Sequence, residues 1–354
     1  MKKNLLTKKL KLAYFGAPEF SARFLEKLLT DKQLPIEIKL VVTQPDKPVG
    51  RKQILTPSPV KVTAQNHKIK TYEIFPAKTA NYRLLTHLFY ELKIDAVIVY
   101  GYGGIIPAYL LQSVRIGFFN LHPSLLPKLR GPSPIPYSIF FTFNDVYNYT
   151  GITLFKMDEK IDHGPIIIQK KMQILPTDKK PDLEIKLTNL AFEMLKKILI
   201  KLILTDFNRF RLIKQDEKQA TYTRRLKKED GFIPFGVLKA TLENKIPNER
   251  SVKIKFIPKI ITDFQQKNPN HSIANCQLPN SPIIIFNYFR GLYPWPGIWT
   301  KVKINGQEKR LKITDINLVG DTNLHPLQII KVQLEGKKEV DFTTFNRVYK
   351  LFKL

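Results

Sequence analysis

The sequence predicts an α/β protein in which a domain built on a mostly parallel sheet is followed by a small β-barrel domain. In the first 207 residues, apolar runs that end at turn residues alternate with segments of helical periodicity, as in parallel sheets covered by helices. After residue 220 the pattern changes to short β-like runs separated by Gly, Asn and Pro, which is typical of small barrels. A chain of 354 residues is long enough for two such domains.

The first domain is expected to begin with a strand at Leu10–Phe15 and a helix at Ser21–Leu29, where apolar residues recur at helical spacing. Five further strands are expected at Ile38–Thr43, Asp95–Tyr100, Gly117–Leu121, Gly151–Met157 and Ile166–Met172. A long amphipathic helix at Asp182–Asp206 is acidic at its start and lysine-rich toward its end, as the helix dipole favours. This helix closes a first domain at residues 1–207.

A polar and charged stretch at residues 208–220 predicts a linker, and residues 221–354 are expected to form the second domain. Its strands are expected at Val252–Ile257, Ile283–Tyr288, Ile298–Ile304, Lys309–Ile316, Gln328–Leu334 and Glu339–Thr343.

The charge of the chain indicates an anionic partner. There are 58 Lys and Arg residues against 30 Asp and Glu residues, which gives a formal net charge of +28. Such a positive field attracts and holds phosphates, and a nucleic acid is the expected partner. A generally lysine-rich proteome is the alternative explanation.

Cys276 is the single cysteine, so an intramolecular disulfide and a zinc cluster are both excluded and no metal is expected. The basic segment at residues 1–11 is followed by a short apolar run without a small-residue cleavage site, so it is not a signal peptide. The apolar stretch Ala96–Leu111 contains three glycines and a proline, which argues against a membrane span. A cytoplasmic protein is therefore expected.

The segment around Asn120 and His122 carries a catalytic set of side chains. Residues two apart share one face of an extended strand, so a single carbonyl-sized group can meet the Asn120 amide and the His122 imidazole together. Both lie where a predicted parallel strand ends, which is where ligands gather in such sheets. Asp162, on a glycine-containing turn about 40 residues further on, supplies a carboxylate, and Asp158 is its rival. Taken singly, each of these residues is more often a turn former or a packed loop residue.

The order of these motifs resembles the folate-dependent formyltransferases, which use 10-formyltetrahydrofolate. The pattern is Asn-x-His-x-Ser-Leu-Leu-Pro, then Arg-Gly at Arg130, then Ile-Asp-x-Gly at Asp162. Further runs resemble the methionyl-tRNA formyltransferase branch: Phe15–Phe20, Thr43–Arg51, Pro57–Lys61, Thr221–Tyr222 and Tyr293–Pro296. The resemblance covers roughly residues 10–235 and resumes near residue 285. It implies a Rossmann-like sheet domain, an OB-like C-terminal barrel and a monomeric chain.

The resemblance also implies site residues and substrates. It gives catalysis to Asn120 as oxyanion donor, His122 as proton-transfer group and Asp162 as the carboxylate that orients the imidazole. The donor, 10-formyltetrahydrofolate, is a co-substrate, and its pocket would be lined by Ser124, Leu125, Leu126, Pro127, Tyr102 and Gly103. The Gly16-Ala17-Pro18 turn lacks the glycine fingerprint of a dinucleotide site, so no dinucleotide cofactor is expected.

The acceptor implied by the resemblance is methionyl initiator tRNA. Basic residues expected to contact the RNA are Lys47, Arg51 and Lys52 on one loop, with Arg224 and Arg225 after the predicted linker. Further lysines and arginines lie on the predicted barrel strands at residues 301–312 and suit phosphate contacts that position an RNA. The alternative for the loop with Lys47, Arg51 and Lys52 is a solvated basic segment that makes no RNA contact.

The sequence departs from the family pattern at two places, and three other functions are alternatives. Residues 244–282 are an insertion of about 40 residues, and Phe140–Tyr149 is about four residues longer than the family needs. An amino-sugar formyltransferase would share the donor and the catalytic residues, but the net charge argues against it. A transformylase of the glycinamide ribonucleotide type is usually a single domain, and the extra 150 or so residues argue against it. The intact Asn120, His122 and Asp162 argue against a non-catalytic RNA-binding protein.

Overall fold

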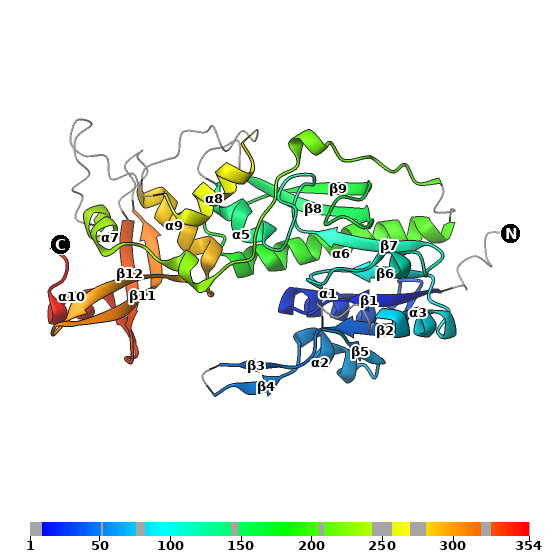
Figure 1. Cartoon of the computed structure of the whole chain (residues 1–354), viewed down its shortest axis with the longest axis horizontal. Coiled ribbons are helices and arrows are strands. Elements are labelled where there is room, and N and C mark those ends of the chain that lie inside the picture. The colour runs from blue at the N-terminus through cyan, green and yellow to red at the C-terminus, as the bar shows by residue number, and fades with distance from the viewer. Residues whose placement is uncertain are drawn as a thin grey trace. The chain divides into compact units, whose positions relative to one another are not determined.

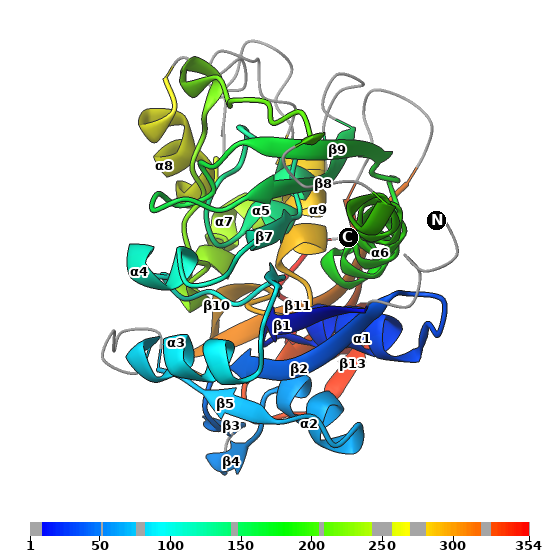
Figure 2. The same cartoon turned by 90° about the vertical axis from the view of Figure 1, so that its right-hand side faces the viewer.

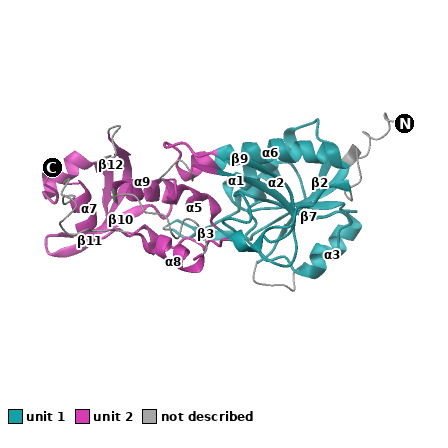
Figure 3. Cartoon of the chain, turned by 90° about the horizontal axis from the view of Figure 1, so that it is seen from above, with its two compact units in different colours: residues 1–132, 150–172, 184–220 teal, residues 133–149, 173–183, 221–354 magenta. Residues whose placement is uncertain are grey.

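The computed structural model describes residues 9–50, 52–75, 82–142, 148–204, 209–242, 257–269, 281–319 and 327–353. The chain divides into two compact units, coloured separately in Figure 3. Unit 1 comprises residues 1–132, 150–172 and 184–220, and unit 2 comprises residues 133–149, 173–183 and 221–354. The domain boundaries expected from the sequence stay a prediction, because compactness alone does not define a region that folds by itself.

A seven-stranded sheet forms the core of unit 1, in the order β5-β2-β1-β6-β7-β8-β9. The strands are β1 (Leu10–Phe15), β2 (Ile36–Thr43), β5 (Thr71–Glu73), β6 (Ala96–Val99), β7 (Gly117–His122), β8 (Tyr149–Lys156) and β9 (Ile166–Gln173). The first five strands in this order are parallel, and β8 runs antiparallel to β7. The predicted mostly parallel α/β sheet is confirmed.

Successive side chains of β1 point to opposite faces of the sheet, and a different set of helices covers each face. On one face, Phe15 packs edge-on against Phe89 of α3 (Tyr82–Glu91), beside α4 (Ala108–Leu111). On the other face, Tyr14 stacks on Phe24 of α1 (Glu19–Thr30), which also contacts α6 (Lys180–Leu204). Figure 2 shows α1 and α3 on opposite sides of the sheet. Both faces are therefore covered, and the strand ends are left to carry ligands.

A two-stranded hairpin extends away from this sheet within unit 1 (Figure 1). It consists of β3 (Lys47–Val49) and β4 (Ile54–Thr56) and leads into α2 (Pro59–Asn66). Lys61 of α2 binds Asp46 at 2.8 Å and Glu73 at 2.7 Å. This pair of contacts ties the base of the hairpin to the end of β5.

Unit 2 contains a four-stranded antiparallel sheet of β10 (Ile298–Ile304), β11 (Gln307–Leu318), β12 (Leu327–Leu334) and β13 (Glu339–Asp341). These strands match four of the predicted runs and form the small barrel-like part of the fold. The helices of unit 2 are α5 (Pro134–Phe140), α7 (Phe235–Leu242), α8 (Lys259–Lys267), α9 (Ser281–Leu292) and α10 (Phe342–Tyr349).

One strand expected in the second domain is a helix, and another lies almost wholly outside the described residues. Ile283–Tyr288 was expected to be a strand, but it lies within α9, so this prediction is wrong. Its apolar residues are buried against α5, where the Phe140 and Tyr288 rings lie 5.0 Å apart. A continuous apolar run does not distinguish a buried helix from a buried strand. The other run, Val252–Ile257, lies outside the described residues except for Ile257.

Candidate active site

The three predicted catalytic residues meet at the end of β7, the last parallel strand of the sheet. Asn120 and His122 are both on β7, and His122 is only 4% exposed. The Asp162 carboxylate reaches both of them: its Oδ1 accepts a hydrogen bond from Asn120 Nδ2 at 3.3 Å, and its Oδ2 lies 3.6 Å from His122 Nδ1. The structure therefore places side chains 42 residues apart in sequence around one carboxylate.

The rival carboxylate faces a different histidine. Asp158 Oδ2 lies 2.5 Å from His163 Nδ1, and its Oδ1 accepts the Lys160 N–H at 3.0 Å. Asp162 Oδ2 accepts the Gly131 N–H at 2.7 Å in addition to facing His122. Geometry thus favours Asp162 over Asp158 as the carboxylate beside the imidazole.

The tautomer of the neutral His122 ring follows from the hydrogen-bond partner of its Nε2. Nε2 lies 2.9 Å from the Leu129 carbonyl oxygen, and a carbonyl oxygen can only accept a hydrogen bond. Nε2 therefore carries the hydrogen in the neutral ring, and Nδ1 is the nitrogen that can exchange a proton. This nitrogen is the one beside Asp162.

A close approach of two backbones explains the glycine after Asp162. A Cβ atom at Gly164 would lie 1.9 Å from the Lys156 carbonyl oxygen and 3.2 Å from the Asp158 nitrogen. Only glycine allows the turn to lie this close to the end of β8. Asp162 itself has a φ of +50°, a left-handed conformation that Asp tolerates better than most residues.

The loop that follows His122 is held by hydrogen bonds to β8 and β9. Thr153 Oγ1 donates to the Ser124 carbonyl at 2.7 Å and accepts the Leu126 N–H at 3.1 Å. Gln169 Nε2 donates to the Leu126 carbonyl at 2.7 Å, and Ser124 Oγ donates to the Lys128 carbonyl at 2.6 Å. Leu125 and Pro127 are half-buried. The predicted folate-binding loop is therefore held in place by side chains of two neighbouring strands.

The second predicted folate-binding segment consists of a buried tyrosine followed by more exposed residues. Tyr102 is 2% exposed, and its hydroxyl lies 3.2 Å from that of Tyr82 in the core. Burial raises the pKa of Tyr102, so the phenol stays neutral. Gly103 follows with a φ of +72°, and Ile105 is 67% exposed. Gly103 and Ile105 are thus the parts of this segment that a ligand can reach, and at Gly103 the exposed surface is backbone.

The predicted RNA-contacting residues lie in different settings. Lys47 begins β3, and its Nζ donates to Gln44 Oε1. Lys52 is exposed at the tip of the hairpin, while Arg51 lies outside the described residues. Exposed apolar side chains surround the tip: Val49, Ile54 and Leu55.

Arg224 and Arg225 differ from each other. Arg224 donates to both carboxylate oxygens of Asp230 at 2.7 and 2.9 Å, and these hydrogen bonds raise its pKa. A phosphate would have to compete with this bidentate pair. Arg225 is exposed and is the better placed of the two for a phosphate.

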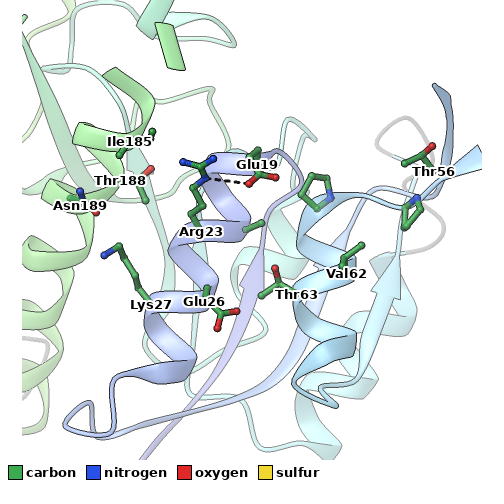
Figure 4. A pocket seen from close by; sticks show the side chains of 13 residues that line it. Glu19, Arg23, Glu26, Lys27, Thr56, Val62, Thr63, Ile185, Thr188 and Asn189 are labelled. Carbon is green, nitrogen blue, oxygen red and sulfur yellow. Dashed lines mark hydrogen bonds and ion pairs between the residues drawn. The ribbon is translucent and has the colours of Figure 1, made fainter. Parts of the chain in front are cut away.

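A groove in unit 1 takes no part in this site. It has a volume of about 660 Å³ and lies between α1, the start of α2 and α6 (Figure 4). Its lining includes Glu19, Arg23, Thr63 and Thr188, and none of the predicted catalytic residues. Over the described ranges, no group of three or more His, Cys, Asp and Glu residues is placed to hold a metal ion. Within the same ranges, no helix is long and apolar enough to cross a bilayer.

The sequence did not reveal a hydrogen-bonded group of polar residues next to the site, of which Arg130 and Gln215 are buried. Arg130 is fully buried, and its guanidinium binds Gln215 and Glu217. Residues 208–220 were expected to be a linker, yet Gln215 is 5% exposed and belongs to this group. His163, which has no predicted role, has its Nε2 3.5 Å from Oε1 of Glu217.

The ion pair between Glu217 and Arg130 predicts a pH dependence of stability. Hydrogen bonds from Arg130 hold the pKa of Glu217 below its ordinary value of 4.5. A carboxyl with a lowered folded-state pKa stabilises the protein fully above its unfolded pKa, and this stabilisation is lost as the pH falls through the folded pKa. We expect the wild type to unfold at a higher temperature than Glu217→Gln at about pH 6. The difference should shrink as the pH falls below 4.5 in thermal unfolding followed by circular dichroism. A difference that stays constant across this range would contradict the assignment.

Comparisons with known proteins show the family of the chain. Residues 9–199 match the formyl transferase family. A methionyl-tRNA formyltransferase of Caldicellulosiruptor saccharolyticus is 31% identical over 364 aligned positions, which cover 97% of this chain and 98% of that protein. The enzyme of the same name from Staphylococcus epidermidis is 36% identical over 91% of this chain and 84% of its own length. The crystal structure of a 4-N formyltransferase from Francisella tularensis shares the fold, with a TM-score of 0.52 at 17% identity over 86% of this chain and 97% of that chain. The chain therefore belongs to the formyl transferase family, among its methionyl-tRNA formyltransferases.

Proposed function

We propose that this protein transfers the formyl group of 10-formyltetrahydrofolate to the α-amino group of methionine carried by initiator tRNA. The observation that carries the proposal is the meeting of Asn120, His122 and Asp162 at the end of β7. The near full-length relatives, named as methionyl-tRNA formyltransferases, support the same reaction. A monomeric, cytoplasmic enzyme is part of this proposal.

Each catalytic side chain has a part in this reaction. The amine nitrogen attacks the formyl carbon, and negative charge develops on the formyl oxygen. Asn120 supplies an uncharged N–H donor for this oxyanion. His122 takes the proton that the amine loses, through Nδ1, and returns it to the leaving nitrogen N10 as the bond from the formyl carbon to N10 breaks. Asp162, 3.6 Å from Nδ1, stabilises the imidazolium that forms in between.

The folate site in this proposal is built from backbone. A pterin ring has an edge of hydrogen-bond donors and acceptors that main-chain groups can read. Gly103, whose exposed surface is backbone alone, supplies such groups, and the loop at residues 124–127 is held in place after His122. Gly103 has a left-handed φ and only the Gln44 amide within reach of a Cβ, so this segment suits a close ligand.

The tRNA site in this proposal rests on two basic surfaces, one in each unit. The surface in unit 1 is the hairpin β3–β4, whose segment includes Lys47, Arg51 and Lys52. The surface in unit 2 is one face of β10 and β11, because residues paired across two strands lie on the same face of the sheet. That face carries Trp299, Lys301, Lys303, Arg310 and Lys312, together with the acidic Glu308, which binds Lys301 at 2.6 Å. Contacts from such residues to phosphates position an RNA without reading its sequence.

An assay with two acceptors tests the proposal. Purified protein is incubated with 10-formyltetrahydrofolate and either methionine-charged initiator tRNA or a nucleotide-linked amino sugar. Formylation of the charged tRNA alone is the expected result. Formylation of the sugar alone would mean that the acceptor is wrong and the donor right. Formylation of neither would overturn the proposal.

Replacing Lys52 by alanine is expected to weaken the use of tRNA selectively. The apparent KM for charged tRNA should rise by about threefold to tenfold, because a phosphate contact at the hairpin tip is lost. The KM for the formyl donor should change by less than about twofold. Arg51→Ala should act in the same direction, and Lys32→Ala, an exposed lysine elsewhere in unit 1, serves as control. Equal changes in the KM of both substrates would contradict an RNA contact.

A further inference from the structure

A buried arginine lies directly behind the candidate active site. Arg130 is 0% exposed, and a charge removed from water must be paired to be tolerated. Its Nη1 and Nη2 donate to the Glu217 carboxylate at 2.9 and 2.6 Å, and its Nε and Nη2 donate to Gln215 Oε1 at 3.1 and 2.8 Å. Both partners come from a segment 85 to 87 residues further along the chain. The Arg130 side chain is thus fixed by a long-range, charge-assisted set of hydrogen bonds.

The neighbours of Arg130 in sequence are both in contact with catalytic side chains. The Leu129 carbonyl accepts the hydrogen bond from His122 Nε2 at 2.9 Å. The Gly131 N–H donates to Asp162 Oδ2 at 2.7 Å. Leu129 and Gly131 have φ values of +60° and +100°, so this backbone needs its surroundings to hold it. Anchoring Arg130 therefore fixes the two main-chain groups that orient His122 and Asp162.

Gln215 extends the same set of hydrogen bonds to the other side of the site. Its Nε2 donates to the carbonyl of Asp162 at 2.9 Å and to that of Gly164 at 2.8 Å. Its Oε1 accepts from Arg130. One amide group therefore connects the loop after His122 with the turn that carries Asp162.

From these contacts we propose that Arg130 and Gln215 are positioning residues that set the distance between Asp162 and His122. They act through the backbone of the loop and the turn, because their own side chains are too buried to touch a substrate. Gln215 and Glu217, together called the clamp, then hold the loop after His122 and the turn of Asp162 in place. This inference rests on the proposed function.

The test uses Gln215→Met, which keeps the volume of the side chain but removes every hydrogen bond it makes. We expect kcat for formyl transfer to fall by about 10- to 100-fold, since small misplacements of catalytic groups cost this much. The KM of each substrate should stay within about twofold. In an Asp162→Ala background the same substitution should cost less than about twofold, because Gln215 then has no carboxylate to position.

Unit 2 offers a matched control. Arg290 and Asn287 are each 2% exposed, Arg290 Nη2 donates to Asn287 Oδ1 at 2.6 Å, and Asn287 Nδ2 donates to the Thr142 carbonyl at 3.1 Å. This is a similar arrangement of a buried arginine, an amide and a carbonyl, and these hydrogen bonds include no catalytic side chain. Asn287→Leu should lower the melting temperature about as much as Gln215→Met but leave kcat within about twofold.

A readout without turnover separates this inference from the proposed function. We expect Gln215→Met, but not Asn287→Leu, to move the imidazole ¹⁵N signals of His122 in NMR spectra of the full chain. A wild type that formylates no charged tRNA would overturn the proposed function, and the His122 signals would still test the clamp. Three outcomes overturn the clamp: unchanged His122 signals in Gln215→Met, a kcat within about twofold of wild type, or an equal loss in the wild-type and Asp162→Ala backgrounds.

Discussion

Replacing His122 by alanine is expected to lower kcat by about 10²-fold or more without unfolding the protein. The substitution removes the Nδ1 atom that lies 3.6 Å from Asp162 and, in the proposed reaction, carries the proton from the amine to the leaving nitrogen. Binding of both substrates is left to other groups, so the KM values should change much less than kcat. Steady-state rates with each substrate varied at saturation of the other measure this.

Two companion variants sharpen the test of His122. Alanine leaves the Leu129 carbonyl without the hydrogen bond that His122 Nε2 donates, so His122→Gln is needed as a variant that can keep this bond. His67→Ala is the matched control, because this ring contacts a carboxylate outside the site, that of Glu26, at 2.9 Å. It should retain kcat within about threefold. If His122→Ala and His122→Gln both turn over near the wild-type rate, His122 has no part in proton transfer.

The sheet of unit 1 could be predicted because its signals are local. β1 has the predicted bounds, Leu10–Phe15, and β7 extends the predicted strand by a single residue. Most of these strands contain apolar runs bounded by turn residues, which reveal them locally, whereas the short, polar β5 was not predicted. The error at Ile283–Tyr288 has the opposite origin. Three consecutive isoleucines favour a strand by propensity, but packing against α5 stabilises a helix there.

The candidate site was predictable only in part. Asn120, His122 and Asp162 stand out because their order within a motif resembles that of a known family, and the structure brings the three together. Nothing local marks Arg130 as buried or Gln215 as its partner, since their contact spans 85 residues. A polar stretch predicts solvent exposure, yet burial of Gln215 is decided by what the rest of the chain places around it.

Replacing Asp162 by asparagine should be nearly as damaging as losing His122, although the two side chains have almost the same shape. Each carboxylate oxygen already faces a donor: Oδ1 accepts from Asn120 Nδ2, and Oδ2 accepts from the Gly131 N–H. An asparagine amide in either orientation therefore points N–H groups at another donor. In the proposed reaction, the substitution also removes the negative charge that would stabilise the His122 imidazolium. We expect kcat to fall on the order of 10²- to 10³-fold.

Asp158→Asn is the control for this prediction. Asp158 lies four residues before Asp162 and bonds His163 and the Lys160 N–H, so its charge is directed away from His122. Its replacement should change kcat by less than about threefold. The two carboxylates differ in their partners rather than in their chemistry, so the pair of variants compares position alone. A larger loss of kcat in Asp158→Asn than in Asp162→Asn would make Asp158 the catalytic carboxylate, and it would mean that the turn moves when substrate binds.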